Sequence, residues 1–253
     1  MKDICILNFN HTYEAQNFYK RENYKILDLT DLKNVSRYCE KENLQIIRER
    51  LLPYKDIKIN FIDSGNFHYI TYLLLERIKE DFTLVLLDHH TDMQKPMFEE
   101  LISCGSWVRK ALEDNKYLKK VILIGAKREL QSYTDKKYLD KIVYISEDDI
   151  NKSDFNRDIL FKNINYPVYI SIDKDVINKN ESITDWDQGN LTLRQLKEIY
   201  LMIKNIQTLL GIDICGDCST FGLLDSHTNH INDMANRNIL NIIEEYEEIE
   251  VTS

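Results

Sequence analysis

Glycine and proline are scarce in this chain, which has 7 Gly and 3 Pro among its 253 residues. That scarcity excludes collagen-like repeats and long flexible linkers, and it disfavours a turn-rich β-sandwich. Basic residues are outnumbered, with 33 Lys and Arg against 42 Asp and Glu, which gives a formal net charge of −9. A protein that coats DNA or RNA needs clustered basic residues, so this balance argues against a nucleic-acid partner.

Long hydrophobic runs and a dense cysteine framework are also lacking. Apolar runs such as Leu84–Leu87 and Val121–Gly125 are far shorter than the roughly 20 residues of a membrane-spanning helix, so we expect no membrane partner. The five cysteines are an odd, scattered set, which favours a reducing, cytoplasmic location. Cys215 and Cys218 form an isolated C-x-x-C, which is a weak signal for structural zinc. Residues Met1–Phe9 predict a β-strand rather than a signal peptide.

The chain does contain an alternation of short β-branched runs with amphipathic segments. Runs such as Thr83–Leu87 are apolar at every position, which is typical of strands covered on both faces in a parallel sheet. We therefore predict an α/β fold, a three-layer α/β/α sandwich with a mainly parallel sheet of about eight strands, built as a single domain over residues 1–253. The predicted strands are Ile4–Phe9, Tyr24–Leu29, Ile57–Ile62, Thr83–Leu87, Lys120–Ile124, Ile142–Ile145, Pro167–Ile172 and Leu209–Ile214. The clearest predicted helices are Val35–Leu52, Phe67–Lys79, Ser106–Asp114, Leu193–Ile206 and Ile231–Glu248.

A cluster of metal-binding residue types follows the strand predicted at Thr83–Leu87. The segment is D-H-H-T-D, and its D-x-H-x-D spacing groups Asp88, His90 and Asp92, because alternate residues of an extended chain share a face. Two carboxylates and an imidazole suit a divalent ion such as Mn²⁺. Ligands of an open parallel sheet bind beyond the carboxyl ends of its strands, which is where this segment lies.

Two other strand ends supply matching groups. Asp173 and Asp175 follow the strand Pro167–Ile172, and His68 follows Ile57–Ile62. Each cluster alone is also explained by a turn or a helix cap. Together, four carboxylates at one crevice would repel one another and resist ionisation unless cations neutralised them. The sequence therefore predicts a site for two divalent ions.

The order and spacing of these motifs, from His68 to about Asp213, resemble those of the arginase (ureohydrolase) family, in which S-x-D-x-D follows D-x-H-x-D about 80 residues later. The resemblance implies the three-layer α/β/α fold and two Mn²⁺ per chain. It implies that one ion is held by His68, Asp88, Asp92 and Asp173, and the other by Asp88, His90, Asp173 and Asp175. It further implies that a hydroxide bridging the metals is the nucleophile and that Asp92 passes its proton to the leaving amine.

Two segments depart from the family pattern. Cys104 stands where an S-H-G-x-x-x-R segment usually has its histidine, and His11 is a candidate replacement, with an ordinary loop residue as the alternative. Gly216 stands where a D-x-x-E segment usually has the glutamate that binds the guanidinium, so the neighbouring Asp217 is a candidate to pair with it. Further candidates for substrate contact are Asp185, Trp186 and Asp187, for which a solvated loop is the alternative.

These departures resemble a divergent branch of the family that includes the peptide arginases. The sequence therefore predicts a Mn²⁺-dependent hydrolase of C–N bonds other than peptide bonds, which converts an arginine side chain, preferably in a peptide, to ornithine and urea. The expected partners are a small guanidino compound or an arginine-containing peptide, and a homo-oligomer stays open. Two alternatives also stay open: a metal-dependent amide hydrolase or deacetylase on a related fold, and a non-catalytic relative that keeps the metals.

Overall fold

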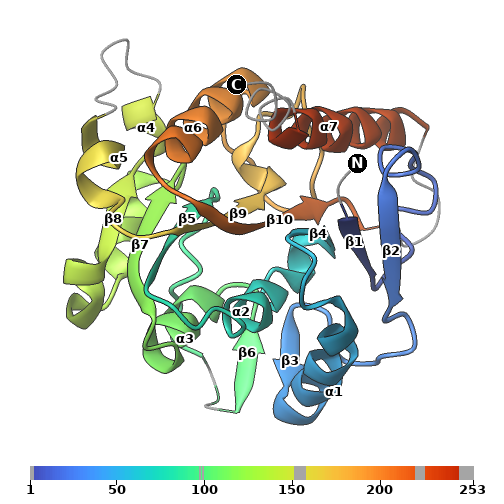
Figure 1. The fold of residues 1–253 in the computed structure, drawn as a ribbon, viewed down its shortest axis with the longest axis horizontal. Coiled ribbons are helices and arrows are strands. Elements are labelled where there is room, and N and C mark those ends of the chain that lie inside the picture. Colours follow the sequence, from blue (N-terminus) through green and yellow to red (C-terminus); the bar gives the residue numbers. More distant parts are fainter. Residues whose placement is uncertain (1–2, 97, 99, 151–157, 220–225, 245–253) are drawn as a thin grey trace.

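A central sheet of eight strands, in which every pairing is parallel, organises the molecule (Figure 1). The computed structural model describes residues 3–96, 98, 100–150, 158–219 and 226–244. The strands of the sheet are β1 (Asp3–Asn8), β2 (Asn23–Asp28), β4 (Ile59–Ser64), β5 (Phe82–Leu87), β7 (Leu118–Ile124), β8 (Ile142–Ile145), β9 (Val168–Asp173) and β10 (Leu209–Asp217). Their order is β2-β1-β4-β10-β9-β5-β7-β8, which confirms the predicted parallel sheet of about eight strands.

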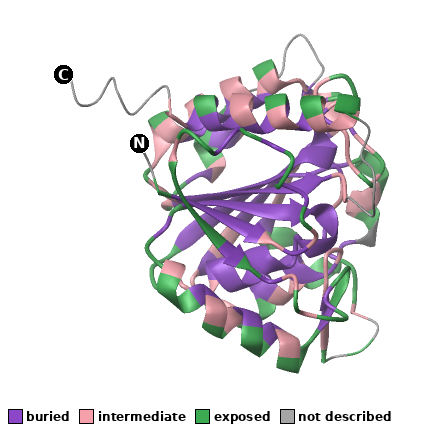
Figure 2. Ribbon diagram, turned by 90° about the vertical axis from the view of Figure 1, so that its right-hand side faces the viewer, coloured by how far each residue is buried: buried purple, intermediate pink, exposed green. Residues whose placement is uncertain are grey.

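Helices cover both faces of the sheet and give the predicted three layers (Figure 2). One face carries α1 (Lys41–Leu51), α2 (Ile70–Leu75) and α3 (Trp107–Asp114), and the other carries α5 (Asp158–Asn163), α6 (Leu193–Ile206) and α7 (Ser226–Glu244). The shorter helices are α4 (Glu147–Ile150), η1 (Leu52–Tyr54), η2 (Gly65–Phe67), η3 (Arg128–Tyr133), η4 (Lys136–Lys141) and η5 (Lys174–Val176). None of the described helices has the length and apolar content needed to cross a membrane.

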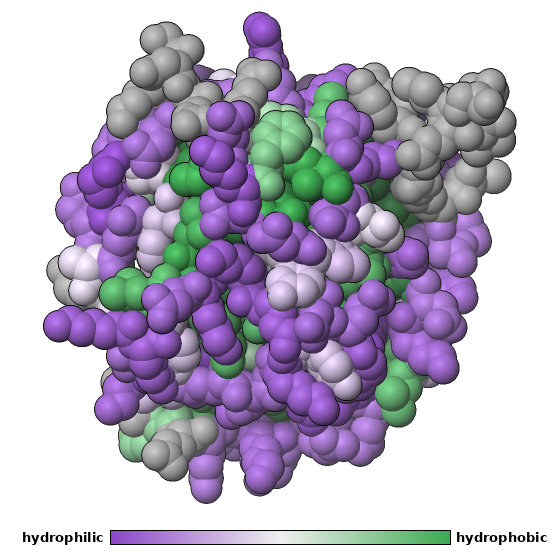
Figure 3. Space-filling model, turned by 60° about the vertical axis from the view of Figure 1, so that its left-hand side comes forward, coloured by the Kyte–Doolittle hydropathy of each residue, from purple (hydrophilic) through white to green (hydrophobic). Residues whose placement is uncertain are grey.

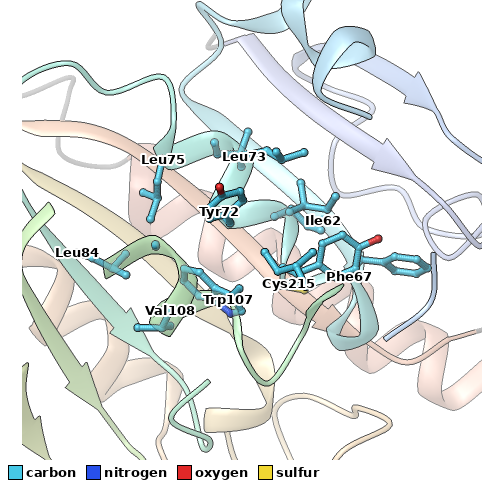
Figure 4. Close-up of a cluster of buried hydrophobic side chains, with 14 of the residues drawn as sticks. Ile62, Phe67, Tyr72, Leu73, Leu75, Leu84, Trp107, Val108 and Cys215 are labelled. Carbon is cyan, nitrogen blue, oxygen red and sulfur yellow. The ribbon is translucent and has the colours of Figure 1, made fainter. Parts of the chain in front are cut away.

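The strand pleat divides the core into two, one under each helix layer. Along β5, Leu84 and Leu86 pack with the first layer, whereas Val85 and Leu87 pack with the second. This two-residue alternation explains why the strand is apolar at every position. Figure 4 shows part of the first core, where Trp107 of α3 lies among side chains of the neighbouring elements. On the face in Figure 3, hydrophilic side chains cover most of the surface and hydrophobic ones gather between them.

The predicted helix Val35–Leu52 is wrong in its first part. Residues Tyr38–Glu40 form strand β3, which pairs antiparallel with β6 (Leu101–Ser103), and α1 begins only at Lys41. Three-residue strands offer too short an alternation to be recognised, and this pairing joins segments about 60 residues apart in the chain. The predicted helix Phe67–Lys79 is too long at both ends, since α2 spans only Ile70–Leu75 and Phe67 is the last residue of the 3₁₀ helix η2.

The strand order creates the position of the site. The strands β4 and β5 follow one another in the chain, but β10 and β9 lie between them in the sheet. The chain therefore passes from β4 to β5 and leaves a gap in the sheet, which β9 and β10 fill later in the sequence. Open α/β sheets bind ligands beyond the carboxyl ends of the strands at such a switch point.

Candidate metal centre

All six predicted metal ligands lie at the carboxyl ends of β4, β5 and β9. Asp88, His90 and Asp92 are in the loop that leaves β5. Asp173 is the last residue of β9, and Asp175 follows it in η5. His68 is the residue directly after η2, which β4 leads into. The structure thus brings together side chains from three separate segments of the chain.

The first group of ligands surrounds His68, which is buried. Its Nδ1 lies 3.4 Å from an oxygen of Asp88, 3.2 Å from one of Asp92 and 3.1 Å from one of Asp173. On the other side of the ring, Nε2 is 2.9 Å from the hydroxyl of Ser171, which donates a hydrogen bond of 2.7 Å to Asp213. This second contact fixes the ring so that Nδ1 faces the three carboxylates.

The second group surrounds His90. Its Nδ1 lies 2.8 Å from an oxygen of Asp175 and 3.6 Å from one of Asp88. Its Nε2 is 2.9 Å from Asp187, whose other oxygen accepts a hydrogen bond of 2.8 Å from Lys127. In each group, three side chains offer donor atoms close enough to share one ion: His68, Asp88 and Asp92 in the first, and Asp88, His90 and Asp175 in the second.

The electrostatics of this cluster fit a cationic occupant. Burial, and then the charge of Asp92, raises the pKa of Asp88 to about 7. Burial, with the charges of Asp173 and Asp88, raises the pKa of Asp175 well above its usual value. Burial acts the same way on Asp173, but the hydrogen bond with His68 outweighs it and lowers the pKa.

One buried carboxylate oxygen in this cluster, 3.4 Å from His68 Nδ1, accepts no hydrogen bond from the described residues. Among the described residues, Asp88 Oδ2 makes no hydrogen bond, and an unsatisfied carboxylate oxygen is expensive to bury. A cation at that oxygen would supply the missing interaction. Carboxylate and imidazole donors at these distances suit Mn²⁺ or a similar divalent ion, so the residues present fit a pair of metals.

Asp92 is held in an unusual conformation. Its φ is 49°, in the left-handed region that residues other than glycine rarely adopt. The Trp107 indole Nε1 donates a hydrogen bond of 2.5 Å to the Asp92 carboxylate, and Val108 N donates one of 3.2 Å to its carbonyl oxygen. Trp107 therefore fixes the Asp92 side chain and Val108 fixes its backbone, and such backbone strain is typical of functional positions.

A cavity of about 250 Å³ opens above the six ligands. Trp186 and Cys104, both predicted to contact substrate, line it. Burial, and then the charge of Asp92, raises the pKa of the Cys104 thiol to about 12, so it is a neutral thiol near pH 7. A larger cavity of about 510 Å³ lies between α1, α2 and α3, and none of the predicted site residues lines it.

Asp217 does not line the cavity above the ligands as the described residues define it. It is fully buried and accepts a hydrogen bond of 2.6 Å from Lys174 Nζ, which is fully buried as well. Asn236 of α7 donates a second hydrogen bond to it at 2.8 Å, and Gln16 a third at 3.2 Å. Asp217 is therefore committed to an internal ion pair.

His11, Asp185 and Asp187 also lie away from the cavity lining as the described residues define it. His11 is exposed and contacts Glu14 at 2.6 Å. Asp185 accepts a hydrogen bond of 2.8 Å from Ser219 N. Asp187 contacts the predicted ligand His90 at 2.9 Å and does not line the cavity.

Gly216 explains the missing glutamate at the end of β10. Its φ is 93°, and a Cβ there would lie 2.2 Å from Asp173 Oδ1 and 2.8 Å from Lys174 N. The carboxylate of the predicted ligand Asp173 therefore takes the space that a side chain would need, and only glycine fits.

Sequence reasoning did not find the residues that support the ligands. These are Ser171 and Asp213 behind His68, and the Lys174 network with Gln16 and Asn236. Lys174 carried a usable signal, since it is a lysine enclosed between two predicted metal ligands. Gln16 and Asn236 carried none, because only the folded chain brings residues 220 positions apart into contact.

Comparison with known proteins identifies the family. The family model described as "Arginase family" matches residues 6–216. An uncharacterized protein of Thermotoga maritima is 32% identical over 224 residues, covering 85% of this chain and 79% of that protein.

Solved structures of low sequence identity share the fold. The proclavaminate amidino hydrolase of Streptomyces clavuligerus superposes with a TM-score of 0.68 at 15% identity, over 96% of this chain and 90% of that one. The formiminoglutamase of Trypanosoma cruzi with Mn²⁺ superposes with a TM-score of 0.67 at 10% identity, over 96% and 91%. With a family model that spans most of its length, and with its predicted ligands gathered at the edge of this sheet, the chain belongs to the arginase family.

Proposed function

We propose that the protein is a metal-dependent hydrolase that cleaves a guanidino group and releases urea. Membership of the arginase family supports hydrolysis of a C–N bond other than a peptide bond. The main observation behind the proposal is the convergence of four aspartates and two histidines, in which the buried Asp88 Oδ2 accepts no hydrogen bond from the described residues. A T. cruzi formiminoglutamase of the same fold contains Mn²⁺, which supports manganese as the metal.

We assign the ligands as the sequence resemblance implies. His68, Asp88, Asp92 and Asp173 would hold one Mn²⁺, and Asp88, His90, Asp173 and Asp175 the other. Two dications held there would lower the pKa of a bound water toward neutrality and would so supply a nucleophile near pH 7. Asp88 and Asp173 each contribute to both sets, and the support of His68 by Ser171 keeps the first set in register.

Asp92 is the residue to which we assign the proton transfer. The Trp107 indole holds its carboxylate in place, which leaves a group of fixed direction beside the reacting atoms. It would take a proton from the attacking water and deliver it to the leaving amine as a general base and then acid. Cys104 is a poor substitute for the family's histidine, because its thiol stays neutral at the pH of the reaction.

The substrate class we propose is an arginine side chain, with ornithine as the product. Trp186 at the rim of the cavity presents an aromatic surface for an incoming planar group. The departures at Cys104 and Gly216 resemble the peptide-arginase branch, which supports a peptide as the carrier of the arginine. We also propose a cytoplasmic location, since all five cysteines are free thiols.

A urea-release screen tests this proposal. The purified protein, stripped with chelator and reloaded with Mn²⁺ or Mg²⁺, is given free arginine, agmatine and arginine-containing peptides. Urea should appear only with the Mn²⁺-loaded protein, and Asp92→Asn should remove most of the activity while retaining the fold by circular dichroism. Asp81→Asn, at an exposed ion pair with Lys119, is the matched control. Urea release that is equal with and without metal would contradict the proposal.

One observation favours a second candidate, a metal-dependent amide hydrolase or deacetylase. Asp217 is bound to Lys174, and the only carboxylates lining the cavity in the described chain are metal ligands, so no separate acid is left to pair with a guanidinium. An amide substrate needs no such acid. The same screen decides between the candidates when N-acetylated amines are included and acetate is measured beside urea.

A further inference from the structure

An arginine at the mouth of the cavity has no carboxylate partner in the described part of the chain. Arg37 lines the cavity, yet no described Asp or Glu lies within 4.0 Å of its guanidinium. Arg48 and Arg50, by contrast, lie 2.7 Å and 2.6 Å from acidic side chains. A guanidinium normally gains from a bidentate carboxylate contact, so Arg37 has bonding capacity that the protein does not use.

The fold nevertheless holds Arg37 in one place. Its φ is 66°, its N–H donates a hydrogen bond of 3.0 Å to Asn66 O, and its carbonyl accepts one of 3.0 Å from Cys104 N. The side chain is held too: Nε donates to Asn66 Oδ1 at 3.3 Å, and the guanidinium carbon lies 5.1 Å from the centre of the Trp186 ring. The group is therefore positioned before any ligand arrives, which reduces the entropic cost of binding.

The charges around the cavity leave a positive excess at its mouth. The lining carboxylates of the described chain are Asp88, Asp92, Asp173 and Asp175, all in the metal centre. Two divalent ions would offset these four charges, and the cation of Arg37 would remain. A second positive group on the substrate would find no free acid there, whereas an anionic group would meet Arg37.

We propose that Arg37, stacked on Trp186, binds a carboxylate at the end of the substrate remote from the group that is hydrolysed. This rests on the proposed release of urea from a guanidino group, and it replaces the preference for an arginine within a peptide by one for a guanidino compound with a free carboxylate. The substrates are then small guanidino acids, which include free arginine and a C-terminal arginine. Arginine inside a peptide, and guanidines that end in an amine or a methyl group, lack the carboxylate. The cavity of about 250 Å³ lies below the roughly 300–1,000 Å³ of pockets for drug-sized ligands, which favours a small substrate.

A matched pair of substrates measures the contribution of the carboxylate. In 5-guanidinopentanoate and pentylguanidine the chains are equal in length, and a carboxylate replaces a methyl group. The kcat/KM for urea release should be about 10- to 100-fold higher for the acid, mostly through KM, as for a hydrogen bond to a charged group. Arg37→Met should reduce this ratio to within about twofold, and Arg37→Lys should keep part of it. Because each ratio is taken within one protein, altered folding or metal content cancels.

A binding measurement gives a readout that needs no turnover. The Mn²⁺-loaded protein is titrated with 5-aminopentanoate, the amine product of the acid, and the change in tryptophan fluorescence is followed. Half-saturation with 5-aminopentanoate should require at least tenfold more ligand in Arg37→Met than in the wild type. Pentylamine should bind to the wild type no more tightly than 5-aminopentanoate binds to Arg37→Met. Trp186→Phe should remove the signal, which separates it from Trp107. Arg194→Met, at an exposed ion pair on α6, is the matched control and should bind like the wild type.

Three results would overturn the inference. They are equal kcat/KM for the acid and pentylguanidine, an unchanged ratio or affinity in Arg37→Met, and hydrolysis of an internal peptide arginine as fast as of free arginine. If no guanidino compound releases urea, the proposed function fails. The 5-aminopentanoate titration still decides whether Arg37 binds a carboxylate, so the two failures are distinct.

Discussion

Two buried polar clusters meet at η5, and they are neutralised in different ways. Asp173 and Asp175 belong to the metal cluster with His68 and His90. Lys174, between them in the chain, belongs to an internal network, where its ammonium bonds to Asp217 and Asn236. The internal network contains its own counter-ion, whereas the metal cluster has more carboxylates than the chain can neutralise. A buried acid therefore indicates a ligand site only where the protein has no cation of its own to neutralise it.

The largest expected effect follows from removing a carboxylate that has no protein cation. Asp88→Asn should lower urea release by about a thousandfold or more, because Asp88 contributes to both groups of ligands. Bound Mn²⁺, measured by elemental analysis, should fall below two per chain. The fold should survive, since the change removes one of four mutually repelling charges. Two retained ions would show that Asp88 is not a ligand.

Removing the cation of the other cluster should act on stability instead. Lys174→Met leaves Asp217 buried and unpaired, which should cost about 3 kcal/mol of unfolding free energy in chemical denaturation. The double variant Lys174→Met with Asp217→Asn should recover part of this loss, because both charges are then gone. A loss of unfolding free energy below about 1 kcal/mol would mean that the ion pair is not a main support of η5.

Adding metal should stabilise one cluster and leave the other as it is. At a Mn²⁺ concentration about 100 times the dissociation constant, binding to the native state contributes about 2.7 kcal/mol, or a rise of roughly 5 to 10 °C in Tm for a chain of this size. Differential scanning calorimetry should find this rise in the wild type and in Lys174→Met, but not in Asp88→Asn. An equal rise in all three would indicate binding elsewhere on the protein.

The two clusters also differ in how much of them could be predicted from the sequence. All eight sheet strands were predictable, and so was the convergence of the six candidate ligands, because apolar runs and alternate spacing are local patterns. The role of Asp217 was not, since it depends on the pairing of β10 with β9, in which Cys215 is opposite Asp173. That register brings Gly216 against Asp173 and Asp217 against Lys174. Neither contact follows from spacing along the chain.

Gly216 lies where the two clusters touch, so a methyl group there should disturb both. Gly216→Ala adds a Cβ 2.2 Å from Asp173 Oδ1 at a positive φ, and we expect a loss of about 2 kcal/mol with weaker Mn²⁺ binding. Gly105→Ala is the matched control for stability, because the three atoms nearest to its Cβ all belong to the flexible Gln94 side chain, the closest at 3.1 Å. Equal losses in the two variants would remove the special role of Gly216.

The smallest expected effect comes from Asp187, and it distinguishes the two groups of ligands within the metal cluster. It contacts His90 Nε2 at 2.9 Å, while His68 is supported by Ser171 instead. Asp187→Asn should therefore weaken Mn²⁺ binding about tenfold, and only at one of two sites resolved by titration calorimetry. This is the lower end of the effect expected for a residue that hydrogen-bonds to a metal ligand, because the Asp187 side chain is exposed. Lys127→Met, which removes another partner of Asp187 without touching His90, should have less effect. If both sites weaken equally, the two ions share one support rather than two.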